Sequence, residues 1–393
     1  MTVDADIAIC GAGPAGMALA ALLVKRGVRA DRIALIDAKT LEQAQNDPRS
    51  LALSYGSRQI LEGIGAWPIP STPIHDIHVS RRGQFGRSMI SNAEQGVPAL
   101  GYVTRYGAIV QGVPALGYVT RYGAIVQVLG AVCTQMGVRS LRPARVLRKD
   151  EDASQVILHL EGEAPQMLRA AIVVQAEGGL FGEQDDKSVT RDYRQSAVIA
   201  QVRTSAPVAH RAYERFTHEG PLALLPQDEE YSMVWCCRPD TAASLLELDD
   251  AAFLGRLREM FGDRLGAFTA TGRRLAFPLG LNAGVTGSAR TAAIGNAAQT
   301  LHPVAGQGLN LGLRDATVLA RLLAQDAAPA QLAQYAELRR QDRSLTVRAT
   351  DTMARIFAND SPAQALLGLS LAAIDIIRPA RSLLAELMMY GRR

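Results

Sequence analysis

The stretch DIAICGAGPAG, residues 6–16, decides the fold. Its first five residues read as a short buried strand, and a GxGxxG turn follows directly. The segment from Met17 to Arg26 reads as a helix that Gly27 ends, and RIALID at residues 32–37 reads as a second strand. A strand, a helix and a strand in this order form a βαβ unit, so the sequence predicts a parallel sheet.

The glycine turn has the residue types that a bound dinucleotide requires. Gly11 permits the tight turn, Gly13 lets the backbone approach a pyrophosphate, and Gly16 lets the helix pack closely on the strand. The helix that follows the turn directs its N-terminal amides at the pyrophosphate and favours its negative charge, and Pro14 and Ala15 of the turn belong to the predicted cofactor-binding residues.

Asp37 ends the second strand, 21 residues after Gly16, where an acidic side chain would bind a ribose hydroxyl. A GxGxxG sequence alone is weak, because a glycine turn without a ligand has the same pattern. The βαβ context and Asp37 together predict dinucleotide binding, but they do not choose between FAD and NAD.

The composition excludes several classes of protein. Of the 393 residues, 48% are hydrophobic and 20% charged, a normal globular balance, and the net charge is only +4. Basic residues form no run of five or more, so nucleic-acid binding is not expected. The N-terminus does not resemble a signal peptide, and no apolar stretch is long enough to span a membrane. We therefore expect a cytoplasmic protein.

No metal site is expected. The four cysteines show no spacing typical of a disulfide framework or a zinc site. His75 and His78 form an HxxH pair, but their strand-like context argues against a metal pair.

The order of patterns along the chain predicts a nucleotide-binding domain interrupted by a second domain. Alternating, strand-like patterns occupy residues 73–100 and about 190–240, and helical patterns run from about residue 309 to the end. We expect a discontinuous nucleotide-binding domain at residues 1–72, 101–182 and 283–335. A β-sheet substrate domain is expected at residues 73–100 and 183–282, and a C-terminal helical region at residues 336–393.

An identical repeat interrupts this order. Residues 95–110, QGVPALGYVTRYGAIV, recur without change as residues 111–126. Solenoid repeats diverge and are more numerous, so this is either a recent tandem duplication or an error in the recorded sequence. Only one copy can occupy the place that the fold provides. Arg105 and Arg121 are thus interchangeable candidates for one site, and we favour Arg121 because the following helix is contiguous with it.

A second glycine-rich stretch lies far along the chain. AAIGNAA at residues 292–298 reads as a strand entering a polar turn, and HPVAGQGLN at residues 302–310 opens a helix. This region resembles the second FAD fingerprint of the para-hydroxybenzoate-hydroxylase class of flavoprotein monooxygenases. Within that class, residues 295–315 are most similar to the ubiquinone-biosynthesis hydroxylases of the 2-polyprenyl-6-methoxyphenol hydroxylase type. The similarity extends to residues 47–67, 77–86 and 212–226.

The resemblance implies roles for particular residues. Gly295 and Asn296 would lie against the ribityl chain and the pyrophosphate of FAD, with Asn in place of the usual Asp. Arg49 matches the family's arginine near the FAD phosphates. Backbone amides at a helix N-terminus would face the flavin edge, where charge accumulates on reduction. The implied flavin-edge residues are His302, Pro303, Gly306, Gln307 and Gly308, and the implied cofactor-binding set extends through Leu309 and Asn310.

One family motif is altered. The usual Ala-Asp-Gly followed by Ser and Arg stands here as Gln175-Ala176-Glu177-Gly178-Gly179, without the downstream Ser and Arg. Because the family uses this motif for both FAD and NAD(P)H, the preference between NADH and NADPH stays open.

The activity that the resemblance implies is hydroxylation of a polyprenylated phenol in ubiquinone biosynthesis, with FAD, O2 and transiently bound NAD(P)H, through a C4a-hydroperoxyflavin. The catalytic base is not identified, and His302 and Tyr193 are both candidates. Two alternatives are a flavin reductase on the same fold and a catalytically impaired subunit of a quinone-biosynthesis complex. The apolar segment from Ala365 to Tyr390 is either a peripheral membrane or partner-docking helix on the inner face of the membrane, or a helix that caps the flavin domain.

Overall fold

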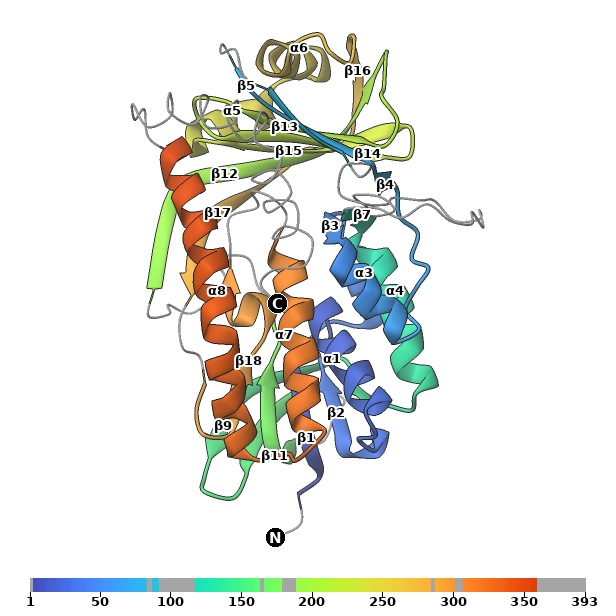
Figure 1. The fold of residues 1–393 in the computed structure, drawn as a ribbon, viewed down its shortest axis with the longest axis vertical. Coiled ribbons are helices and arrows are strands. Elements are labelled where there is room, and N and C mark those ends of the chain that lie inside the picture. The colour runs from blue at the N-terminus through green and yellow to red at the C-terminus, as the bar shows by residue number, and fades with distance from the viewer. Residues whose placement is uncertain are drawn as a thin grey trace.

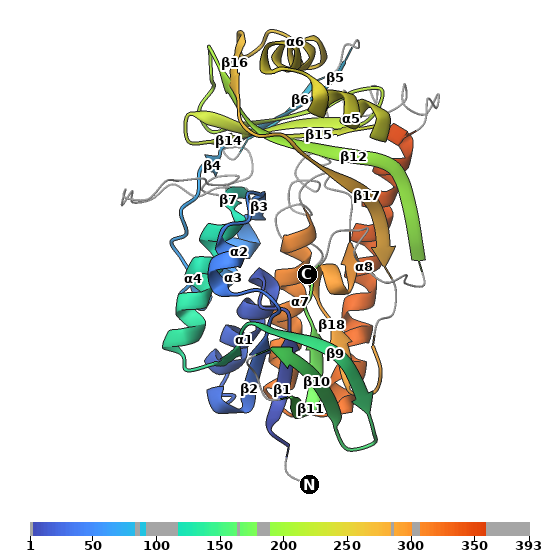
Figure 2. The same ribbon diagram turned by 180° about the vertical axis from the view of Figure 1, so that it is seen from behind.

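Two large sheets lie one above the other in the molecule, with long helices beside the lower one (Figures 1 and 2). The computed structural model describes residues 3–82, 87–91, 117–162, 166–178, 189–283, 287–300 and 307–358.

The lower sheet is built on the glycine-turn strand β1 and has the order β8-β2-β1-β11-β10-β9, with β18 also beside β11. Its strands are β1 (Ala5–Cys10), β2 (Ile33–Ile36), β8 (Arg139–Leu141), β9 (Ala144–Glu151), β10 (Val156–Gly162), β11 (Met167–Gln175) and β18 (Thr291–Ala293). Strands β8, β2, β1, β11 and β18 are parallel, which confirms the predicted parallel sheet.

The lower sheet also has an antiparallel branch that the sequence patterns did not predict. Strand β10 runs antiparallel to both β9 and β11. The links from β9 to β10 and from β10 to β11 are only a few residues long. Such links form hairpins, because a parallel pair needs a crossover of about a dozen residues or more.

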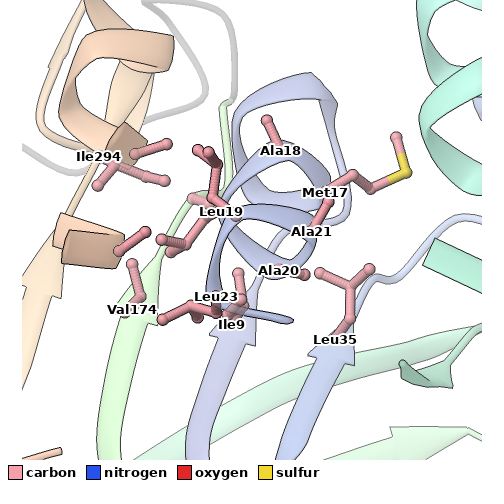
Figure 3. Packing of buried hydrophobic residues seen from close by; sticks show 14 of the residues in the cluster. Ile9, Met17, Ala18, Leu19, Ala20, Ala21, Leu23, Leu35, Val174 and Ile294 are labelled. Carbon is pink, nitrogen blue, oxygen red and sulfur yellow. The ribbon is translucent and has the colours of Figure 1, made fainter. Parts of the chain in front are cut away.

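Helix α1 (Pro14–Lys25) covers one face of the lower sheet. It begins at Pro14, three residues earlier than predicted, because proline fits the first turn of a helix, where its missing N–H is not needed. Figure 3 shows its Leu19 and Leu23 packed toward Val174 of β11 and Ile9 of β1, and all four side chains are buried. Other helices below the upper sheet are η1 (Ala30–Arg32), α2 (Leu41–Gln45), α3 (Tyr55–Gly63), α4 (Tyr122–Gln135), η4 (Gly295–Ala297), α7 (Gln307–Leu323) and α8 (Pro329–Ala358).

A small third sheet contains the repeated sequence. It has the order β3-β7-β4, formed by β3 (Ser50–Ser54), β7 (Gly117–Arg121) and β4 (Pro73–Ile74). The second copy of the repeat therefore supplies β7 and, from Tyr122 to Val126, the first turn of α4. The first copy, residues 95–110, lies outside the described residues.

The upper sheet has the order β19-β17-β12-β15-β14-β13-β5-β6, with β16 beside β12. Its strands are β5 (Asp76–Arg81), β6 (Arg87–Ser91), β12 (Val189–Thr204), β13 (Arg211–Phe216), β14 (Pro221–Gln227), β15 (Glu230–Cys237), β16 (Phe268–Thr271), β17 (Leu275–Ala283) and β19 (Gln299–Thr300). Helices α5 (Pro239–Glu247) and α6 (Asp250–Phe261) cover its outer face, and its inner face is turned toward β3, β7 and α7 (Figures 1 and 2).

The two sheets thus bring distant parts of the chain together. Strand β5 pairs in parallel with β13, although about 130 residues separate them. The predicted α/β fold with a β-rich insertion and C-terminal helices is confirmed. The domain boundaries given above stay a prediction.

Within the described part of the chain, no helix is long and apolar enough to cross a membrane. Over the same residues, no group of three or more His, Cys, Asp or Glu side chains could hold a metal ion. The segment from Ala365 to Tyr390 lies outside this part, so its membrane or capping role stays a prediction.

Candidate functional site

The glycine turn after β1 is too tight for side chains. Gly11 has φ +106°, and its N–H donates to the carbonyl of Ile36 over 2.7 Å. A Cβ atom at Gly11 would lie 2.5 Å from the carbonyl carbon of Ala176, and one at Gly16 would lie 1.9 Å from the carbonyl oxygen of Gly11. The turn therefore folds back onto β11 and onto the first turn of α1, as the GxGxxG pattern requires.

Two acidic residues flank this turn. The Ala12 N–H donates to Oδ2 of Asp37 (2.7 Å), and the Lys39 N–H donates to Oδ1 (2.8 Å). Glu177 follows the neighbouring strand β11, where burial and the charge of Asp37 raise the pKa of its carboxyl group. Strand β1 lies between β2 and β11, so both acids stand at the carboxyl edge of the sheet beside the glycine turn.

Replacing Asp37 with asparagine is expected to weaken FAD binding about 10- to 100-fold, because a hydrogen bond to a charged acceptor contributes about 1.5–3 kcal/mol. Flavin fluorescence during titration of the apoprotein measures the dissociation constant. Asp31→Asn, which changes an exposed acid just before β2, is the matched control and should bind FAD like the wild type. Equal affinity of all three proteins would contradict the predicted role of Asp37.

The two predicted arginines lie next to each other on the small sheet. Ser50 of β3 pairs with Arg121 of β7, and the N–H of Tyr122 donates to the carbonyl of Arg49 (2.9 Å). The Arg49 guanidinium lies 5.0 Å from the centre of the Tyr122 ring and is held by Asp47 through Nε–Oδ1 and Nη2–Oδ2 contacts of 2.9 and 2.7 Å.

Tyr122 connects these arginines to the glycine turn. A Cβ atom at Gly13 would lie 3.0 Å from the Tyr122 hydroxyl oxygen. The arrangement therefore brings Arg49, Arg121 and the glycine turn to one region. Tyr122 was not predicted as a site residue, because only the fold shows that the start of α4 faces Gly13.

The second glycine motif packs against the first. Gly295 has φ +59°, and a Cβ atom there would lie 3.5 Å from the Cβ of Ala15 in α1. A Cβ atom at Gly312 of α7 would lie 3.0 Å from the Cα of Gly295. The β18–η4 turn is thus held between the N-terminal turn of α1 and the first turns of α7.

Asn296 lies where the remaining motifs meet. A Cβ atom at Gly178, in the altered third motif, would lie 3.2 Å from the Cβ of Asn296. One at Gly308, near the start of α7, would lie 3.7 Å from the Asn296 Oδ1 atom. Three motifs that are far apart in the sequence therefore converge at the end of β1, β11 and β18.

Asn310 uses its side chain within the protein. Its Oδ1 accepts from the Ser54 N–H (2.8 Å) and from the Ser57 hydroxyl (2.7 Å), and its Nδ2 donates to the Ala52 carbonyl (3.2 Å). This side chain holds α7 against β3 and α3. A role of Asn310 and Leu309 in cofactor binding stays a prediction.

A buried ion-pair network is bonded to the turn of the second glycine motif. Asp315 of α7 is 0% exposed, and its carboxylate accepts from the Gly295 N–H and the Gln299 side chain, both at 3.3 Å. It also binds Arg339 (Nε–Oδ1 2.7 Å) and Arg343 (Nη2–Oδ2 3.1 Å) of α8. The network therefore links α8 to the turn that contains Gly295 and Asn296.

The sequence contains a signal for the Asp315–Arg339–Arg343 network. Asp315 lies four residues from both Leu311 and Leu319, which are buried, so an acidic residue stands on the apolar face of a helix. Arg339 and Arg343 are four residues apart on the next helix and so share one face.

Several predicted residues are not placed. His302, Pro303 and Gly306 lie outside the described residues, and Gln307 and Gly308 open helix α7. Tyr193 is buried in β12, next to an irregularity between Asp192 and Gln195. The roles of these residues at the flavin edge or as a base stay predictions.

The residues at this site fit a dinucleotide with a diphosphate. A backbone free of side chains faces a helix N-terminus at Gly13 and Pro14, which suits a pyrophosphate. Asp37 at the edge of the sheet suits a ribose hydroxyl.

Comparison with known proteins agrees with this chemistry. The family model "FAD binding domain" matches residues 4–71 and 127–350. The chain is 33% identical over 401 residues to "Ubiquinone hydroxylase UbiL" of Rhodospirillum rubrum, covering 96% of this chain and 88% of that protein. It is 26% identical over 329 residues to "3-demethoxyubiquinol 3-hydroxylase" of Escherichia coli, covering 81% and 79%.

Among solved structures, p-nitrophenol 4-monooxygenase PnpA from Pseudomonas putida has the same fold, with a TM-score of 0.76 at 17% identity and full coverage of both chains. The family match and the relatives named as hydroxylases define the class as FAD-dependent monooxygenases. The chain belongs to the FAD-binding-domain family, which confirms the predicted family, cofactor and enzyme class.

Proposed function

We propose that this enzyme hydroxylates the aromatic ring of a polyprenylated phenol in ubiquinone biosynthesis and uses NAD(P)H and O2. Support comes from two relatives whose names describe hydroxylation of ubiquinone or its precursors. The observation that carries the proposal is the convergence of the three glycine motifs at Gly295 and Asn296.

In this proposal the glycine turn and the N-terminus of α1 bind the pyrophosphate of FAD, and Asp37 binds the ribose. Arg49 and Arg121 supply positive charge near the phosphates, and Gly295 and Asn296 hold the ribityl chain. The N-terminal turn of α7, at Gln307 and Gly308, faces the flavin edge. When bound, FAD accepts a hydride from NAD(P)H and supplies the O2 chemistry.

The inner face of the upper sheet would hold the phenol. Ala197 of β12, Cys236 of β15 and Leu279 of β17 form a buried apolar cluster with Val234 beside it. These residues alternate with those that pack on α5 and α6, so the cluster lies on the inner face. An apolar surface excludes water from the reacting ring and suits a prenylated substrate.

Polar contacts fix this sheet to the small sheet below it. The Ser50 hydroxyl of β3 donates to Oε1 of Gln227 (3.0 Å), and the Gln201 side chain donates to the same oxygen (2.8 Å). Gln227 is the last residue of β14, and Gln201 lies in β12. These hydrogen bonds therefore set the position of the upper sheet relative to β3 and β7 of the small sheet.

Mass spectrometry of the aromatic product tests the proposal. The FAD-loaded enzyme is incubated with a 2-polyprenylphenol, O2 and either NADH or NADPH, and we expect a product with one added oxygen atom. NAD(P)H oxidation stimulated by the phenol, without such a product, would favour the flavin-reductase alternative. Bound FAD without any stimulated oxidation would favour the impaired-subunit alternative.

A further inference from the structure

Glu214 lies on the inner face of the upper sheet, which is the face away from α5 and α6. The preceding residue, Tyr213, is buried in the outer core, with its ring centre 5.5 Å from that of Phe261 in α6. Successive side chains of a strand point to opposite faces, so Glu214 points to the inner face. This is the face that is turned toward β3, β7 and the N-terminal half of α7 (Figures 1 and 2).

The neighbours of Glu214 are mostly apolar. It pairs with Ala223 of β14 and with Val79 of β5, and Ala223 pairs in turn with Val234 of β15. One titratable group that interacts with it is the Cys236 thiol, whose pKa is raised by burial and by the charge of Glu214. No hydrogen bond or ion pair holds the Glu214 carboxylate within the described part of the chain.

Other charged groups on this face lie at strand ends. Arg81 ends β5 and pairs with Phe216, two residues beyond Glu214. Glu230 begins β15 and is bound to Arg203 (Nε–Oε1 2.6 Å). Among the residues that the structure describes, Glu214 is therefore an acidic side chain in the middle of an apolar face without a cationic partner.

The Glu214 side chain is partly covered by the surrounding protein. Its burial raises the pKa to about 7, whereas the residue as a whole is only half-buried. An unpaired buried carboxyl group costs folding free energy, and such groups are concentrated at functional sites.

We propose that Glu214 is a catalytic residue that accepts the hydroxyl proton of the phenol substrate. This rests on the proposed function, which places a phenol on the same sheet face. The O–H bond of the phenol breaks, an O–H bond forms on the carboxylate, and the electron pair stays on the phenol oxygen. The electron density at the ortho and para carbons then rises, which favours their attack on an electrophilic oxygen atom.

Glu214 also accepts the second proton that moves in the reaction, the one that leaves the ring carbon. After a ring carbon has gained the hydroxyl group, it gives up its hydrogen as a proton while the ring regains aromaticity. Glu214 returns its proton to the original phenol oxygen and accepts the proton from carbon. The oxygen atom comes from O2 and the electrons from NAD(P)H. The other oxygen atom of O2 leaves as water and takes up the proton that Glu214 accepted from carbon, so Glu214 is a carboxylate again at the end of the cycle.

Glu214→Gln tests the role in turnover, and Glu230→Gln, on β15 of the same sheet, is the matched control. Loss of a general base is expected to lower kcat for hydroxylation about 100-fold. In the wild type, kcat should rise with pH through an apparent pKa near 7, because only the carboxylate accepts a proton. Glu214→Gln should lose this acid limb, and Glu230→Gln should keep it. Retention of the limb in Glu214→Gln would overturn the proposal.

Proton uptake on binding gives a readout that does not depend on turnover. At pH 8, free 4-nitrophenol is mainly the anion. Calorimetry of its binding in buffers of different ionisation enthalpy measures the number of protons that the complex takes up. We expect about one proton for the wild type and for Glu230→Gln, since two adjacent anions share a proton, and none for Glu214→Gln. Equal uptake by all three would overturn the role of Glu214, whereas the identity of the natural phenol is decided separately by the product assay.

Discussion

Replacing Asp315 with asparagine is expected to lower the free energy of unfolding by about 3–5 kcal/mol. Asp315 is 0% exposed and is bound to Arg339 and Arg343 at 2.7 and 3.1 Å. Asparagine keeps the shape but removes the negative charge, so Arg343 loses its carboxylate partner and Arg339 keeps only Asp342 (Nη2–Oδ2 2.7 Å). Urea denaturation followed by circular dichroism measures the change.

A control separates this effect from a general loss of an acid. Asp326→Asn changes an exposed acid just beyond the end of α7 and should alter stability by less than about 0.5 kcal/mol. Because Asp315 also accepts the Gly295 N–H, Asp315→Asn should bind FAD more weakly even at temperatures where it is folded. An unchanged urea midpoint together with unchanged FAD affinity would contradict this role of the network.

The local part of the site could be predicted from the sequence. The strand, glycine turn, helix and second strand are contiguous, and each has its own signal in residue type or periodicity. The positive φ of Gly11 and the position of Asp37 beside the turn follow from that pattern alone. The second motif was found because it resembles a known fingerprint, and the structure packs it against the first through Gly295 and Ala15.

The remaining part depends on pairings between distant segments. The position of Glu214 on the inner face depends on which face of β13 packs on α6, and that is decided by side chains about 40 residues further along. Similarly, the role of Asp315 depends on α8, whose Arg339 and Arg343 bind its carboxylate. Periodicity within one segment gives no information on its partner in space, so these features required the fold.

The repeat offers a prediction in which one copy is the control for the other. Gly123, in the first turn of α4, lies against α2, and a Cβ atom there would be 1.9 Å from the carbonyl oxygen of Gln45. Gly123→Ala is therefore expected to lower the free energy of unfolding by about 3 kcal/mol, a cost typical of overpacking. Alanine favours a helix by about 1 kcal/mol over glycine, so helix propensity alone would predict the opposite sign.

Gly107 has the same sequence neighbours as Gly123, one repeat earlier, and Gly107→Ala should leave the urea midpoint unchanged. Deletion cannot make this distinction, because removal of residues 95–110 or of residues 111–126 yields the same chain. For the first copy to form β7 and the start of α4, 16 residues would have to be inserted between Val110 and Gln127, inside the helix that buries Ile125 and Leu129. Because that insertion would break α4, exchange of the copies should not rescue Gly123→Ala. A loss of stability in Gly107→Ala, or equal losses in both variants, would show that the first copy shares the place of the second.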